Sequence, residues 1–135
     1  MEADGAGKGS PPDPSSTADA NKPADLRDRT RAYALRIIRL YGALPKKTES
    51  QVIGKQMLRS GTAVGANYRE GLRARSKTEY AAKLNLSLME LEETLYWLEL
   101  LEHAEIVPTA RLAPLKSETG ELSAILVSLI KRARA

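Results

Sequence analysis

Small residues recur at helical spacing in the middle of the chain, and they constrain how closely its segments can pack. Gly54, Gly61 and Gly65 are spaced so that on an α-helix they form a single row without side chains. Each interior Gly costs about 1 kcal/mol of helix stability relative to Ala. Close packing of a neighbouring backbone against the row is what offsets this loss. The segment is therefore predicted to be a helix with a second helix pressed against it.

The other face of the same segment is apolar. Ile53, Met57, Val64 and Tyr68 follow one another at intervals of four or seven residues, which is a helical period and not the alternation of a strand. No strand pattern occurs elsewhere in the chain. Short connections should make consecutive helices antiparallel. The predicted fold is all-α, an antiparallel up-down four-helix bundle, with helices at residues 25–43, 49–72 and 76–104 and a fourth helix after a break at residues 107–109.

The first 24 residues differ in composition from the rest. Residues 1–24 are rich in Gly, Pro, Ser, Ala and Asp and carry almost nothing apolar to bury. Such a segment cannot offset the entropy of ordering, so it is predicted to be a disordered polar tail. Residues 25–135 are predicted to form the bundle domain.

Capping residues and prolines indicate where the helices begin. Thr48 or Ser50 is expected to cap the second helix. Ser76 and Glu79 match a capping box at the start of the third. Pro114 is expected in or before the first turn of the fourth helix, because proline removes a helical hydrogen bond.

The third helix has more apolar surface than one seam requires. Trp97, Leu100 and Leu101 lie outside the predicted seam, which suggests burial of a second side of the helix, either under the fourth helix or against another subunit. They are the candidate oligomer interface, and a homo-oligomer is predicted. The seam itself, at alternating intervals of four and three residues, consists of Leu84, Leu88, Leu91, Leu95 and Leu98.

Several classes of function are disfavoured by the sequence. The chain has no Cys, which excludes disulfides and thiolate chemistry. It has neither a secretion signal nor an apolar run of membrane-spanning length, so a soluble cytoplasmic protein with no membrane partner is expected. No nucleophile-base pair or Gly-rich phosphate loop is evident, so neither an enzyme nor a cofactor is expected.

A carboxylate metal site is also disfavoured. The third helix is rich in Glu, but di-iron bundles need a second His, and His103 is alone in the chain and expected at the surface. The carboxylates considered were Glu90, Glu92, Glu93 and Glu99.

Charge is strongly segregated along the chain. Lys and Arg far outnumber Asp and Glu in residues 25–84, whereas residues 85–121 are acidic. A basic cluster near the junction of the second and third helices is a candidate phosphate-binding surface, because guanidinium groups suit phosphate oxygens. The alternative is a solvated face or pairing with the acidic third helix. The candidate nucleic-acid-binding residues are Arg59, Arg69, Arg73, Arg75 and Lys77.

Asn67 and Glu70 lie one turn apart near this cluster. The structural interpretation is that they hydrogen-bond backbone or Arg groups at the helix junction, as buried polar groups usually do. The functional alternative is direct contact with a ligand or RNA.

Three stretches of sequence resemble a known family, the bacterial four-helix-bundle proteins associated with intervening sequences in 23S ribosomal RNA. The resemblance covers about residues 26–133. Gly71, where many relatives have Ala, and the long polar tail depart from the family pattern. The stretches that carry the resemblance are Gln56 with Arg59-Ser60-Gly61-Thr62-Ala63-Val64-Gly65-Ala66-Asn67-Tyr68-Arg69-Glu70-Gly71, Arg75-Ser76-Lys77, and Leu88-Met89-Glu90-Leu91-Glu92-Glu93-Thr94-Leu95-Tyr96-Trp97-Leu98-Glu99-Leu100.

The resemblance implies a ring-shaped assembly, commonly a homopentamer. It also implies a relationship to the accessory variability protein of diversity-generating retroelements, which binds a reverse transcriptase and nucleic acid through a basic surface. The expected function is a non-catalytic oligomeric module that binds nucleic acid, RNA above all, or a ribonucleoprotein. The alternative is a purely structural or protein-interaction bundle, such as a reverse-transcriptase accessory, whose charged halves serve assembly.

Overall fold

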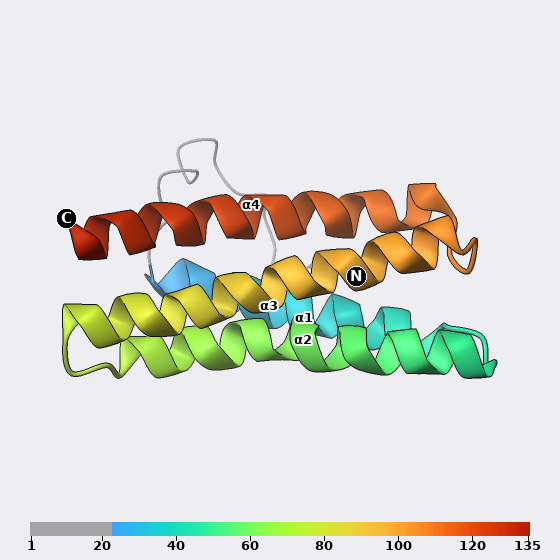
Figure 1. The fold of residues 1–135 in the computed structure, drawn as a ribbon, viewed down its shortest axis with the longest axis horizontal. Helices are drawn as coiled ribbons and strands as arrows, with labels where there is room; N and C mark the ends of the chain where they lie inside the picture. Colours follow the sequence, from blue (N-terminus) through green and yellow to red (C-terminus); the bar gives the residue numbers. More distant parts are fainter. Residues whose placement is uncertain (1–22) are drawn as a thin grey trace, which may run out of the picture.

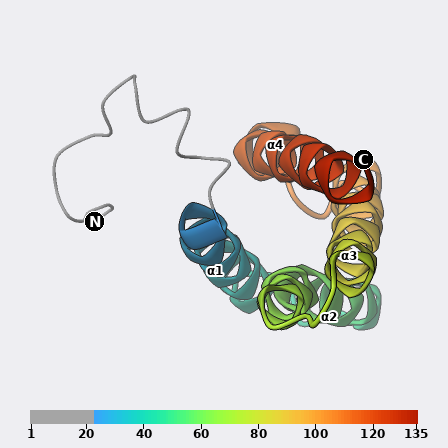
Figure 2. The same ribbon diagram turned by 90° about the vertical axis from the view of Figure 1, so that its left-hand side faces the viewer.

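Four antiparallel helices make up the described part of the chain. The computed structural model describes residues 23–135, so residues 1–22 of the predicted tail (1–24) lie outside the described residues. Consecutive helices follow one another around an arc (Figures 1 and 2), which confirms the predicted four-helix bundle. None of these four helices is long and apolar enough to span a membrane. The helices are α1 (Pro23–Gly42), α2 (Thr48–Leu72), α3 (Lys77–His103) and α4 (Thr109–Arg134).

The row of glycines on α2 faces α1, as predicted. A Cβ atom built at Gly61 would lie 2.8 Å from Cγ1 and 2.9 Å from Cγ2 of Ile37. One built at Gly65 would lie 3.0 Å from Oγ1 of Thr30. At these positions only glycine leaves room for α1, so the row sets the distance between the two helices.

The helix ends agree with the sequence at one junction and differ at two others. Ser76 caps α3, since its hydroxyl accepts from the Glu79 amide at 3.1 Å. The Glu79 carboxylate in turn accepts from the amide of Arg75 at 3.2 Å. The expected cap of α2 by Thr48 or Ser50 is wrong: the helix starts at Thr48, after Lys47 in extended conformation, with no side-chain cap.

Pro114 lies deeper in α4 than predicted. The helix already begins at Thr109, so the proline falls in the second turn instead of the first. It cannot donate to the carbonyl of Ala110, which leaves that group without its helical partner. Ala110 and Pro114 are both exposed, so water can hydrate the carbonyl and the helix continues through the proline.

The core seam of α3 contains hydroxyl groups that the leucine pattern concealed. Leu84, Leu91 and Leu98 are fully buried, as predicted. The intervening buried positions are Ser87 and Thr94, not leucines. The predicted seam residues Leu88 and Leu95 are only half-buried, and of the two only Leu88 packs against the core cluster.

Buried hydroxyls join the four helices in pairs. Thr119 on α4 donates to the carbonyl of Leu115, so Tyr33 on α1 is the donor in its 2.7 Å hydrogen bond with Thr119. Thr94 on α3 similarly donates to its own helix, and it accepts from Ser60 on α2 at 2.7 Å. The two hydrogen bonds between helices form only when the facing helices keep this register.

Of the three residues predicted for an oligomer interface, Leu101 is not exposed for such a contact. Leu101 is fully buried in the core, and Trp97 is half-buried against it, with its Nε1 donating to Glu93 at 3.0 Å. Leu100 is half-buried. The apolar side chains that α3 does expose are Leu86, Met89 and Tyr96.

Candidate nucleic-acid interface

One end of the bundle is basic because four helix termini meet there. The start of α1, the end of α2, the start of α3 and the C-terminus of α4 lie together at the left of Figure 1. Two acidic groups near this end have partners among the described residues: Glu79 in the α3 cap and Asp28 with Arg31 at 3.1 Å. Those basic side chains that lie at this end and form no ion pair with a described residue are what we call the basic end: Arg27, Arg69, Arg73, Arg75, Lys77, Lys131, Arg132 and Arg134.

The basic end is continuous across the termini of α3 and α4. Burial raises the pKa of the Tyr80 hydroxyl near the start of α3, and the positive charge of Arg132 on α4 opposes this rise. The two residues are therefore electrostatic neighbours although they lie far apart in the sequence. Basic residues from different helices thus contribute to one surface potential.

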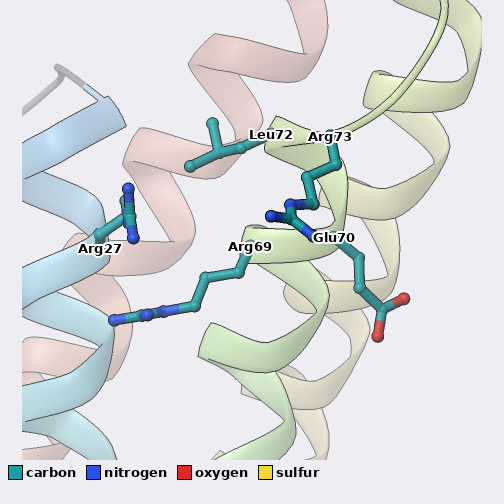
Figure 3. Close-up of a pocket in the computed structure, with 5 residues that line it drawn as sticks. All are labelled: Arg27, Arg69, Glu70, Leu72 and Arg73. Atoms are coloured by element: carbon teal, nitrogen blue, oxygen red, sulfur yellow. The ribbon is translucent and has the colours of Figure 1, made fainter.

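A cleft of about 570 Å³ opens between α1 and the last turns of α2 at this end. Arg27 of α1 and Arg69 and Arg73 of α2 line it together with Leu72 (Figure 3). Glu70 also borders the cleft, but its carboxylate turns away, and its Oε1 lies 2.8 Å from Nζ of Lys83 on α3. Three guanidinium groups therefore share the cleft, and among the described residues that line it the one carboxylate, that of Glu70, turns away from them.

The junction between α2 and α3 forms a second, shallower hollow of about 370 Å³. Arg75 and Lys77 border it beside Ser76 and Tyr80. The amides at the start of α3 add a positive helix dipole to these charges. The arrangement suits phosphate oxygens and offers nothing that selects a particular base.

Known proteins resemble this chain in sequence and in fold. A family model described as 23S rRNA-intervening sequence protein matches residues 24–128. The chain belongs to this family. It is also similar to a crystal structure of a protein of unknown function from the S23 ribosomal protein family of Bacteroides thetaiotaomicron, with 39% identity and a TM-score of 0.75 over 78% of this chain and 98% of that one. A search of curated proteins found no match.

Arg59, one of the predicted nucleic-acid contacts in this family member, does not belong to the basic end. Its guanidinium lies 2.7 Å from Glu93 and 3.1 Å from Glu90, both on α3. The hydrogen bond from Arg59 is the main cause that lowers the pKa of Glu93. Ten residues of helix separate Arg59 from Arg69, which is about 15 Å. Arg59 therefore joins α2 to α3, and two of the carboxylates considered as metal ligands are its partners.

The family-motif residues Asn67 and Glu70 both make structural contacts. Asn67 donates from Nδ2 to the carbonyl of Ala63 in its own helix at 3.0 Å. Glu70 pairs with Lys83, where the sequence had suggested backbone or Arg partners. Neither side chain is directed at the other, so they do not form a joint site.

Some basic side chains of residues 25–84 pair with acidic side chains of residues 85–121 in the same molecule. Arg29 of the basic half pairs with Glu118 at 2.6 Å and with Glu121 at 3.1 Å, which ties α1 to α4. Hydrogen bonding to Glu118 is the main cause that raises the pKa of Arg29. These internal pairs engage Arg29 and Arg59, whereas the side chains of the basic end stay unpaired with any described residue in this 23S rRNA-intervening sequence family member.

Arg27 and the basic C-terminus were missed as members of the site by sequence reasoning. The last turn of α4 contains Lys131, Arg132 and Arg134, whose charges also suit a helix C-terminus. The predicted antiparallel order could have revealed these residues. In such a bundle the C-termini of α2 and α4 lie at the same end as the N-termini of α1 and α3.

Proposed function

We propose that this protein is a non-catalytic, oligomeric module that binds nucleic acid, RNA above all, through the basic end of the bundle. The observation that carries the proposal is the convergence of basic side chains from all four helices, unpaired with any described residue. The family description, which associates its members with 23S rRNA, supports RNA as the nucleic acid. The proposal includes a cytoplasmic location.

The chemistry of the basic end favours phosphate contacts over base contacts. Arg donates to phosphate oxygens in pairs, and Lys supplies a point charge. Contacts of this kind determine position and affinity but carry little sequence information. An oligomer presents one basic end per subunit, so weak contacts add through avidity. Binding should therefore be strong at low salt and only slightly dependent on sequence.

The test is to measure binding of a structured RNA over a range of salt concentrations, with Arg73→Glu/Arg75→Glu as the variant. Loss of these contacts should lower both the affinity and the salt slope, because each neutralised phosphate releases counterions. The matched control is Arg39→Glu/Arg111→Glu, which makes the same change of charge at the opposite end of the bundle. Its salt slope should remain that of the wild type.

Two results would contradict the proposal. Wild-type protein that retains neither RNA nor DNA at about 50 mM salt has no electrostatic nucleic-acid surface. If Arg73→Glu/Arg75→Glu dissociates the oligomer instead of weakening RNA binding, the basic end serves subunit assembly.

The exposed apolar side chains of α3 favour a second candidate function, a structural or protein-interaction bundle. Leu86, Met89 and Tyr96 are each at least 41% exposed and recur at helical spacing. We propose that they form the homo-oligomer contact, with five subunits suggested by the family resemblance. Sedimentation of Met89→Glu/Tyr96→Glu should show smaller species than wild type, whereas Val52→Glu, an isolated exposed apolar residue on α2, should not.

A further inference from the structure

The cleft between α1 and α2 is more specialised than the rest of the basic end. Arg27 approaches it from one helix, and Arg69 and Arg73 approach from the other (Figure 3). Arg69 is half-buried, whereas Arg73, Arg75 and Lys77 are exposed. Guanidinium groups stay charged at every ordinary pH. Three like charges that line one cleft therefore favour a bound anion.

We propose that this cleft binds a terminal phosphate, the phosphate monoester at the end of a nucleic-acid strand. The inference rests on the proposed nucleic-acid function and names the group that the cleft takes. The rest of the basic end, including Arg75 and Lys77, contacts phosphodiesters along the strand.

Charge is the first reason to assign a monoester. A phosphodiester carries one negative charge, whereas a phosphate monoester carries about 1.5 to 2 at neutral pH and has three free acceptor oxygens. Arg27, Arg69 and Arg73 together offer three guanidinium forks to these oxygens. The monoester therefore matches the number of donors and the charge of the cleft better than an internal phosphate does.

Access is the second reason. The cleft is bounded on opposite sides by α1 and α2, with Leu72 among its lining residues. A strand end enters such a space with one nucleotide trailing behind it. An internal phosphate needs room for nucleotides on both sides, which the open junction around Arg75 and Lys77 provides.

The contact between Lys83 and Glu70 holds the Glu70 carboxylate away from the cleft. Nζ of Lys83 lies 2.8 Å from the Glu70 carboxylate, which points toward α3 and away from the arginines. Without Lys83, the Glu70 side chain is free to turn and pair with Arg69 or Arg73. Lys83 is thus a positioning residue that acts through Glu70.

The experiment compares one short single-stranded RNA in three forms, with a 5′-phosphate, a 3′-phosphate or hydroxyl groups at both ends. Wild-type protein should bind a phosphorylated form about tenfold more tightly than the hydroxyl form, the effect expected of charge-assisted hydrogen bonds. Arg27→Gln should abolish this preference. The matched control Arg75→Gln should weaken all three forms by the same factor and preserve the preference.

Two further measurements separate the proposal from general electrostatics. Lys83→Gln should reduce the preference, and Lys83→Gln/Glu70→Gln should restore it, although the double variant has lost the same cation. Lowering the pH from about 7.5 to about 5.5 should also reduce the preference, because the monoester takes up its second proton near pH 6. A nucleoside monophosphate should compete with the phosphorylated RNA for the cleft but should not displace the hydroxyl form from the basic end.

The outcomes distinguish this inference from the function on which it rests. Equal binding of all three RNA forms, or equal effects of Arg27→Gln and Arg75→Gln on them, would refute the terminal-phosphate site while nucleic-acid binding stands. Failure of every form to bind would refute both. A monophosphate that binds at the cleft with no retention of RNA would make the ligand a free nucleotide and also overturn the proposal.

Discussion

Adding one methyl group at Gly61 should destabilise the protein, whereas the same change at Gly120 should stabilise it. Both glycines lie within helices, Gly61 in α2 and Gly120 in α4. A Cβ at Gly61 meets two γ carbons of Ile37 at less than 3.0 Å, and a Cβ at Gly120 meets nothing within 4 Å. The pair thus isolates the packing of α1 against α2 from helix propensity.

The magnitude follows from two opposing terms. Replacing Gly by Ala in a helix favours folding by about 1 kcal/mol. Overpacking a filled site costs about 1 to 3 kcal/mol, and Ile37 is fully buried and branched at Cβ, so it has little freedom to move. Gly120→Ala should therefore gain about 0.5 to 1 kcal/mol. Gly61→Ala should be less stable than Gly120→Ala by about 2 to 3 kcal/mol.

Thermal and urea unfolding followed by circular dichroism measure this difference at a fixed protein concentration. A gap of 2 kcal/mol corresponds to about 8 °C in Tm for a domain of this size. In an Ile37→Ala background the two clashing γ carbons are absent, so Gly61→Ala should no longer cost stability. If Gly61→Ala proves as stable as Gly120→Ala in the unmodified chain, the close approach of α1 is wrong.

Three further predictions follow from the core. Leu91→Ala should lower the free energy of unfolding in urea by about 2 to 5 kcal/mol, and Leu95→Ala by about 1 kcal/mol or less. The reason is that of the two only Leu91 is fully buried. Equal losses would show that Leu95 is a core residue as well. Thr94→Val should cost about 1 kcal/mol, because Ser60 loses its 2.7 Å hydrogen bond and keeps only the 3.3 Å contact with the Met57 carbonyl, and an unchanged urea midpoint would show that this contact suffices. Burial raises the pKa of Tyr33 to about 12, above its unfolded value near 10. The contribution of Tyr33 to the free energy of unfolding is therefore complete below about pH 10 and declines as the pH rises toward 12. Urea midpoints measured across that range should fall less steeply for Tyr33→Phe, and identical slopes would contradict this.

Helical periodicity predicted the fold well because it depends on local spacing. The four helices, the glycine row facing a neighbour and the Ser76 cap all follow from residues close in sequence. Family membership was likewise carried by contiguous motifs such as the one around Asn67, and the family model confirms it.

Assignments that depend on which side of a helix faces its neighbour were less secure. Leucine spacing alone placed Leu95 in the seam and Leu101 outside it. The structure instead buries Leu101 fully in the core, and it buries Thr94, the residue next to Leu95, in the seam. Leu95 and Thr94 are adjacent, and a rotation of about 100° per residue separates their faces. A hydroxyl with a partner on another helix is accepted in the core, and the sequence does not reveal that partner.

The sequence by itself determined that this chain forms an antiparallel helical bundle with a strongly basic region, because hydrophobic period, capping and charge are properties of short segments. Only the tertiary structure decided which charges remain available. It pairs Arg59 with α3 and brings Arg27 into the cleft beside Arg69 and Arg73. The physical reason is that the field at a surface depends on distances in space, and these are set by how the four helices pack.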